Sequence, residues 1–79
     1  MSLYHICYQK QGKLKFISLE LELGNEFEQA VKKGEILENE GKIPKKQWCL
    51  LKGNNLAYAS DVDYYKNNLA LLLTDSCLS

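Results

Sequence analysis

The side chains able to bind a metal or react as a thiol are one histidine and three cysteines in a chain of 79 residues. His5 and Cys7 are two positions apart in a segment rich in strand-forming residues, so both are expected on the same face of a strand. With Cys49 and Cys77 they would give three Cys and one His, a ligand set that zinc accepts. However, the short Cys spacings of zinc sites are missing, and free cysteine is among the most buried residue types. We therefore expect reduced, packed cysteines, with no metal and no cofactor.

No catalytic motif is recognisable in the chain. A cysteine nucleophile would need Cys7 beside His5, but no acid or helix N-terminus is placed to orient the pair. There is no Ser-centred elbow, phosphate-binding glycine loop or metal-binding Asp cluster. The carboxylates of Glu20 and Glu22 are neighbours on one face of a solvated strand, whereas paired catalytic acids work in enclosed sites. The sequence therefore predicts that the protein is not an enzyme.

Lysines gather around two predicted hairpins, a pattern that also occurs in proteins that bind single-stranded nucleic acid. If the hairpins lie side by side, the lysines would share one end of the sheet, and Tyr4, Tyr8 and Trp48 would offer stacking surfaces. Two observations oppose this function: the net charge is zero, and every cation is Lys, without the Arg that reads guanine and clamps phosphate. Nucleic-acid binding is therefore the alternative hypothesis. Its contact residues would be Lys10, Lys13, Lys15, Lys45, Lys46 and Lys52.

Opposite charges are segregated along the chain, which favours a function in protein binding. Residues 20–40 carry seven Glu against two Lys, whereas residues 41–52 carry four Lys and no acid. Such a surface can steer and orient a charged partner. The leading hypothesis is therefore a small protein–protein interaction module that acts by binding, as an inhibitor or regulator does. Its acidic contact residues are Glu20, Glu22, Glu26 and Glu28.

The second predicted helix adds two apolar candidates to this interface. Its residues 69–73 are apolar around most of the circumference, so they are either buried in the monomer or covered by a second copy in a homodimer. Tyr64, with Tyr65 beside it, offers an aromatic anchor of the kind that dominates interface energy. Tyr64 and Leu71 are accordingly the remaining predicted contacts, and a homodimer is a further expectation.

Hydrophobic periodicity predicts strands over 2–9, 14–23, 47–52 and 56–59, and helices over about 26–40 and 61–74. Leu14 and Phe16 have the opposite parity to Ile17 and Leu19. This change indicates either a β-bulge or a strand whose first half is covered on its other face. Gly34 lies on the apolar face of the first helix, where a missing side chain permits close packing on the sheet. The predicted fold class is α+β, with the order β-β-α-β-β-α and a four-stranded antiparallel sheet carrying both helices on one face.

The whole chain, 1–79, is expected to form a single domain with two ββα halves, at about 2–41 and 46–75. Four identities relate the halves at a constant offset, since Cys7, Lys10, Leu14 and Ser18 align with Cys49, Lys52, Leu56 and Ser60. No signal peptide is recognisable, and no apolar run approaches the ~20 residues of a membrane span. We therefore expect a cytoplasmic protein without a membrane partner. Abundant Lys and Asn without Arg suggest a prokaryotic or phage-type source.

Overall fold

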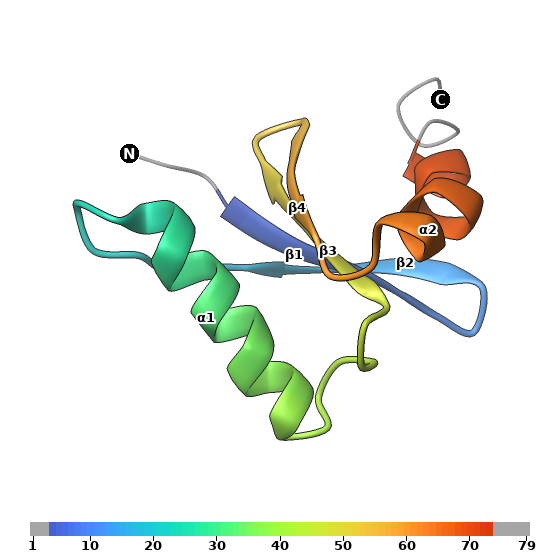
Figure 1. Ribbon diagram of the computed structural model, residues 1–79, viewed down its shortest axis with the longest axis horizontal. Helices are drawn as coiled ribbons and strands as arrows, with labels where there is room; N and C mark the ends of the chain where they lie inside the picture. The colour runs from blue at the N-terminus through green and yellow to red at the C-terminus, as the bar shows by residue number, and fades with distance from the viewer. Residues whose placement is uncertain (1–3, 74–79) are drawn as a thin grey trace.

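Two hairpins supply the four strands of one antiparallel sheet (Figure 1). The structure, a computed structural model, describes residues 4–73. β1 (Tyr4–Lys10) and β2 (Lys13–Ser18) form the first hairpin, and β3 (Trp48–Lys52) and β4 (Asn55–Ala59) form the second. The strand order is β2-β1-β3-β4, so the hairpins are adjacent through β1 and β3. The predicted α+β class, antiparallel sheet and order of elements are confirmed.

The helix α1 (Glu26–Asn39) connects the hairpins over nearly the residues predicted. Gly34 is buried within it and faces the indole ring of Trp48. The helix continues through Gly34 because the missing side chain lets its backbone approach that ring. One turn later, the Glu38 carboxylate accepts hydrogen bonds from the Trp48 indole Nε1 at 2.9 Å and from the backbone N–H of Lys46 at 2.7 Å. These contacts fix the end of α1 against the start of β3.

The second helix follows β4 and is continuous over residues 62–73. It comprises α2 (Val62–Tyr64), a π-helical turn (Tyr65–Leu69) and a final α-helical stretch. Asp61 caps it, because its side chain accepts the N–H of Tyr64 at 3.2 Å. Within residues 4–73, no helix is long and apolar enough to cross a membrane.

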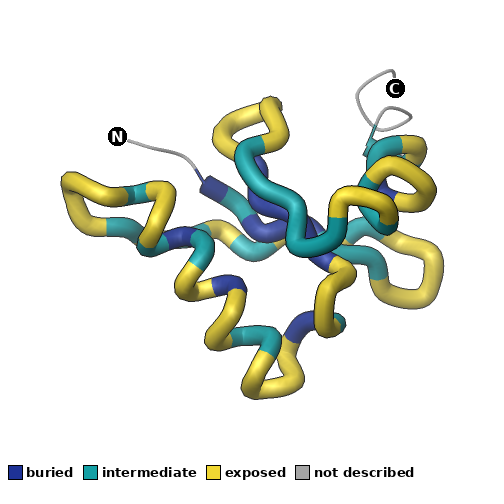
Figure 2. Tube along the Cα trace, viewed as in Figure 1, coloured by how far each residue is buried: buried dark blue, intermediate teal, exposed yellow. Residues whose placement is uncertain are grey.

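The two helices cover opposite faces of the sheet, which corrects the expectation that both pack on one face. Successive strand residues point to opposite faces. Ile6 and Leu50 belong to the cluster beneath α1, whereas their neighbours Cys7 and Cys49 belong to a separate cluster beneath the second helix. Figure 2 shows buried chain concentrated in these central strands. The one-face expectation failed because β1 and β3 are apolar at consecutive positions, a pattern typical of strands buried on both sides.

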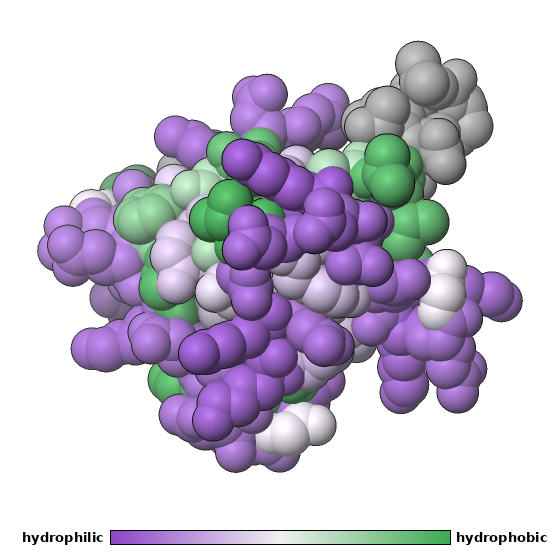
Figure 3. All heavy atoms as spheres, turned by 45° about the vertical axis from the view of Figure 1, so that its right-hand side comes forward, coloured by the Kyte–Doolittle hydropathy of each residue, from purple (hydrophilic) through white to green (hydrophobic). Residues whose placement is uncertain are grey.

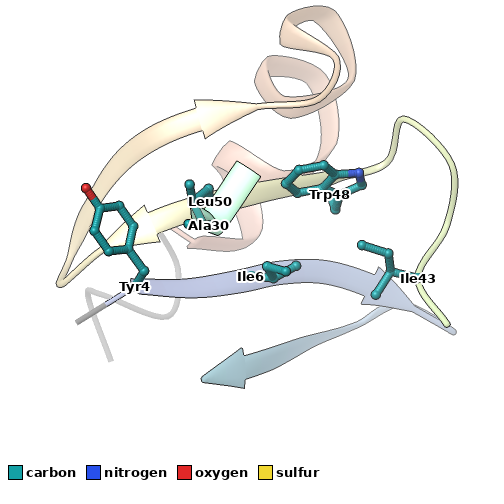
Figure 4. Packing of buried hydrophobic residues seen from close by; sticks show 6 residues of the cluster. All are labelled: Tyr4, Ile6, Ala30, Ile43, Trp48 and Leu50. Atoms are coloured by element: carbon teal, nitrogen blue, oxygen red, sulfur yellow. The ribbon is translucent and has the colours of Figure 1, made fainter. Parts of the chain in front are cut away.

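The α1-side cluster is the larger of the two. Its fully enclosed members come from β1, β3, α1 and the loop before β3, and Figure 4 shows them as Tyr4, Ile6, Ala30, Ile43, Trp48 and Leu50. The cluster beneath the second helix has Cys7, Cys49, Leu51 and Leu69 as its buried members. The core of this small protein is therefore divided by the sheet into two unequal layers.

The apolar parity changes within β2 because its two halves are covered on different faces of the sheet. This is the second of the two predicted explanations. The pairing of β1 with β2 is continuous from His5–Ser18 to Lys10–Lys13, without a bulge. Leu14 packs on the cluster beneath the second helix, whereas Ile17 packs on the cluster beneath α1. β2 ends at Ser18 and not at residue 23, and Leu19 packs on the α1 cluster from beyond the strand.

A β-bulge occurs instead in β4. The pairing shifts between Leu50–Tyr58 and Leu51–Leu56, which leaves Ala57 without an opposite residue. As a result Tyr58 points to the α1 side, where its ring centroid lies 5.6 Å from that of Trp48. Its counterpart in the repeat, Phe16, lies opposite Cys7 and so faces the second helix. The two halves therefore differ in their outer strands as well as in the face that each helix covers.

Candidate functional site

The four acidic candidates follow one another along the loop from β2 to α1 and the first turn of α1. Glu20, Glu22 and Glu28 are exposed, whereas the Glu26 carboxylate accepts the N–H of Gly24 at 3.0 Å. The Gln29 side chain braces the loop, because it donates to the Gly24 carbonyl at 2.7 Å and accepts the N–H of Glu22 at 3.0 Å. The structure thus brings these carboxylates into one acidic segment that is held by local hydrogen bonds.

Tyr64 and Leu71, the apolar candidates, belong to the second helix and therefore lie across the sheet from α1. Tyr64 is half-buried, and its hydroxyl donates to Gln9 Oε1 at 2.9 Å. Burial raises the pKa of Tyr64. Leu71 is 65% exposed. Figure 3 shows a largely hydrophilic face with apolar atoms in small separate areas. The six predicted contact residues therefore do not form one continuous surface.

The antiparallel pairing of β1 with β3 divides the lysine candidates between two ends of the sheet. Lys10 and Lys13 pair with each other beside the first hairpin turn, and Lys45 and Lys46 precede β3 at that same end, since Trp48 pairs with Tyr8. Lys52 lies at the opposite end, where it pairs with Tyr4 and places its Nζ 5.8 Å from the centre of that ring. The expectation that both lysine groups share one end therefore fails for Lys52.

The aromatic rings considered for base stacking are mostly enclosed. Tyr4 is 5% exposed and Trp48 is 2% exposed, and only Tyr8 of the three is half-buried. Trp48 is covered by Gly34 of α1 and lies beside Tyr58. This corrects the expectation that Tyr4 and Trp48 offer a stacking surface, because a base must reach a ring face to stack on it.

Cys7 and Cys49 lie directly opposite each other on β1 and β3, and both are fully buried. A hydrogen bond between the two thiols lowers the pKa of Cys7 and, together with burial, raises the pKa of Cys49. Among the described residues, no group of three or more His, Cys, Asp and Glu side chains is placed to hold a metal. Cys77, the remaining member of the considered zinc set, lies outside residues 4–73.

Among residues 4–73, β2 lies at one edge of the sheet, pairs only with β1, and has regular geometry. The N–H of Leu19 donates to the Tyr4 carbonyl at 3.1 Å. Since inward and outward backbone groups alternate along an antiparallel strand, the N–H and C=O groups of Leu14, Phe16 and Ser18 point away from β1. The opposite edge, β4, is interrupted by its bulge, a feature that hinders further pairing. β2 is therefore the edge suited to accept another strand.

A groove of about 490 Å³ lies beside this edge, between the end of β2 and α1. Apolar side chains form most of it, and a carboxylate and an ammonium group flank them. The lining residues are Ile17, Ser18, Leu19 and Glu20 from the sheet side and Lys33, Ile36 and Leu37 from α1. Ile36 is 49% exposed. Of these residues, only Glu20 was a predicted contact, because tertiary packing alone brings residues 17–20 and 33–37 together.

Comparisons with known proteins return no relative: no protein-family model, no curated protein and no solved structure matches the chain. The class defined by the fold and site is a small α+β domain with one regular free sheet edge beside an apolar groove.

Proposed function

We propose that the protein is a protein–protein interaction module that binds an extended segment of its partner as an added strand beside β2. The observation that carries this proposal is the row of outward backbone groups at Leu14, Phe16 and Ser18, next to the groove along α1. In strand addition, main-chain hydrogen bonds supply affinity and pockets for alternate side chains supply specificity. Both components are available at this edge.

The lining of the groove defines the chemistry of the partner segment. A strand beside β2 directs every second side chain toward α1, where Ile36 and Leu37 favour a large apolar residue. Glu20, with Glu22 beyond it, favours a basic residue at the end of the segment nearest the acidic loop. The acidic segment also steers a basic partner toward the edge before contact. The expected ligand is thus an extended segment of alternating apolar and polar residues with a basic end.

A second copy of the chain is one partner that this edge accepts. Two β2 strands paired antiparallel about a two-fold axis would join the sheets of two copies into one. Sedimentation equilibrium tests this form of the proposal, since a dimer that dissociates when Ser18 is changed to proline identifies the second copy as the occupant. If the protein is monomeric at all concentrations, the partner that binds at the β2 edge is a different protein.

The test of the function uses peptides selected for binding from a random displayed library. Proline lacks the N–H that faces outward at Ser18, and edge strands tolerate it where that group faces solvent. We expect Ser18→Pro to retain the circular dichroism of the native fold and to lose peptide affinity by about tenfold or more, as expected for a lost hydrogen bond at a blocked edge. Ser18→Ala, which keeps the N–H, should bind as the native protein does.

A second pair of variants tests the groove separately from the backbone edge. Ile36→Glu places a charge on the apolar wall of the groove and should abolish binding. Val62→Glu is the matched control, because Val62 is 55% exposed on the second helix, across the sheet. Equal binding by Ser18→Pro, Ile36→Glu and the native protein would refute strand addition at β2.

A further inference from the structure

The thiols of Cys7 and Cys49 form a dithiol at the centre of the sheet. They are directly paired across β1 and β3, on the face beneath the second helix. Because backbone groups alternate along each strand, Cys7 and Cys49 direct their N–H and C=O groups toward each other and form a hydrogen-bonded pair, whose Cα atoms are about 5.5 Å apart. This spacing lies within the roughly 4.4–6.8 Å that a disulfide bridges. The Cβ atoms of such a pair are about 5.5 Å apart, farther than the roughly 3.5–4.5 Å of a relaxed disulfide, so a bond between the two sulfur atoms requires β1 and β3 to move closer together at this pair.

The second helix covers this dithiol through only a few buried contacts. It packs on the thiols through Leu69, which is fully buried, and through the partly buried Tyr64, Tyr65 and Leu73. Tyr65 packs against the cluster that contains the two cysteines, and burial, with the nearby Cys49 and Cys7 sulfurs, raises the pKa of its hydroxyl. A helix with a single fully buried side chain among its described residues is of the kind that opens locally without global unfolding. Opening of this helix would expose both thiols at once.

We propose that Cys7 and Cys49 are an oxidation site at which a hydroperoxide converts the dithiol to a disulfide linking β1 to β3. In the first step one of the two thiols loses its proton and its sulfur attacks the peroxide, the O–O bond breaks, and the leaving oxygen takes up that proton to depart as an alcohol or water, so that this cysteine becomes a sulfenic acid. In the second step the other thiol loses its proton and its sulfur attacks the sulfenic acid sulfur, the S–O bond breaks, and the leaving hydroxide takes up that proton to depart as water. The two sulfurs together lose two electrons, and the peroxide is reduced.

Either sulfur can react first, because the two thiols are directly paired and equally buried. The disulfide closes a loop containing β2 and α1, the two elements that border the groove. Oxidation would thus hold the proposed binding edge in its folded arrangement.

The experiment uses the full chain with Cys77→Ser, so that Cys7 and Cys49 are its remaining thiols. After treatment with hydrogen peroxide, intact mass should fall by two hydrogens, the protein should stay monomeric, and dithiothreitol should restore the mass. Peptide mapping without reduction should show Cys7 linked to Cys49, and neither Cys7→Ala nor Cys49→Ala in this background should form the link. Unchanged mass, a gain of oxygen atoms, or disulfide-linked dimers would each overturn the proposal.

The rate of that oxidation tests whether opening of the second helix controls access to the two thiols. Leu69→Ala removes packing between the second helix and the dithiol, and should accelerate disulfide formation on the order of tenfold. Ile43→Ala is the control, since it removes a buried side chain of similar size from the cluster beneath α1. If both variants react at the same rate, or neither reacts faster than the native protein, opening of the second helix does not control access to the thiols.

Discussion

Gly34 of α1 lies directly against the six-membered ring of Trp48 on β3, so closely that a Cβ atom at residue 34 would come within 2.6 Å of Cζ3 and 2.9 Å of Cζ2. One turn further along α1, the carboxylate of Glu38 accepts the indole N–H of the same ring. Trp48 is thus held by α1 at two points. α1 also forms one wall of the candidate groove, so these two contacts hold that wall against the sheet.

Replacing Gly34 with alanine should destabilise the protein, although alanine favours a helix by about 1 kcal/mol over glycine. The added methyl group overlaps the ring, and overpacking of this kind costs typically about 1–3 kcal/mol. Urea denaturation measures the difference. Glu35→Ala, at the exposed neighbouring position, should stay within about 0.5 kcal/mol of the native protein. Greater stability of Gly34→Ala than of the native protein would contradict the observed packing.

Glu38 should make stability depend on pH. Its hydrogen bonds from the Lys46 N–H and the Trp48 indole lower its pKa from the usual 4.5. A carboxylate with a lowered pKa in the folded state stabilises the protein above the unfolded pKa, and this contribution is lost as pH falls through the folded pKa. Glu38→Gln should therefore reduce the unfolding free energy at pH 7, by about 0.5–1 kcal/mol for a half-buried group partly screened by solvent.

The measurement is urea denaturation of both proteins at pH 7 and again well below pH 4.5. The difference between Glu38→Gln and the native protein should be present at pH 7 and should shrink at the lower pH. Glu35→Gln, on the exposed side of α1, controls for loss of charge alone. A difference that is constant with pH would mean that the Glu38 carboxylate does not stabilise the fold through its charge.

The parity change between Phe16 and Ile17 shows what the sequence could and could not predict. This change predicted two alternatives, a β-bulge or a strand covered on different faces at its two ends. The second alternative occurs, and it requires packing on both sides of the sheet. The prediction that both helices pack on one face did not take this requirement into account. The bulge at Ala57 could not be predicted, because the surrounding segment Leu56–Ala59 has no periodicity that fixes its register.

The candidate site was less accessible to sequence reasoning than the fold was. Charge segregation pointed to Glu20, which does border the groove. The apolar wall at Ile36 and the free backbone of β2 depend on which strand lies at the edge, and the sequence left the order of the hairpins open. The pairing of Cys7 with Cys49 depends on the same order. Local sequence patterns predicted the helices and strands, whereas the site depends on how those helices and strands assemble.

Reversal of the acidic segment should weaken the partner complex mainly through its rate of association. With Glu20, Glu22, Glu26 and Glu28 changed to Lys, we expect slower association at low salt and a smaller effect at high salt, because screening removes long-range steering. Surface plasmon resonance at several salt concentrations measures both rates. Reversal of Glu35 and Asp63, two acids outside the segment, is the control. Unchanged association rates would remove the acidic segment from the binding mechanism.

The most direct test of strand addition is amide hydrogen exchange, measured by NMR, in the free protein and in its complex with a selected peptide. In the free protein the N–H groups of Leu14, Phe16 and Ser18 should exchange faster than those of Lys15 and Ile17, which face β1. In the complex these three should become protected together, while the second helix is unaffected. Continued fast exchange at Leu14, Phe16 and Ser18 with the peptide bound would contradict a binding edge at β2.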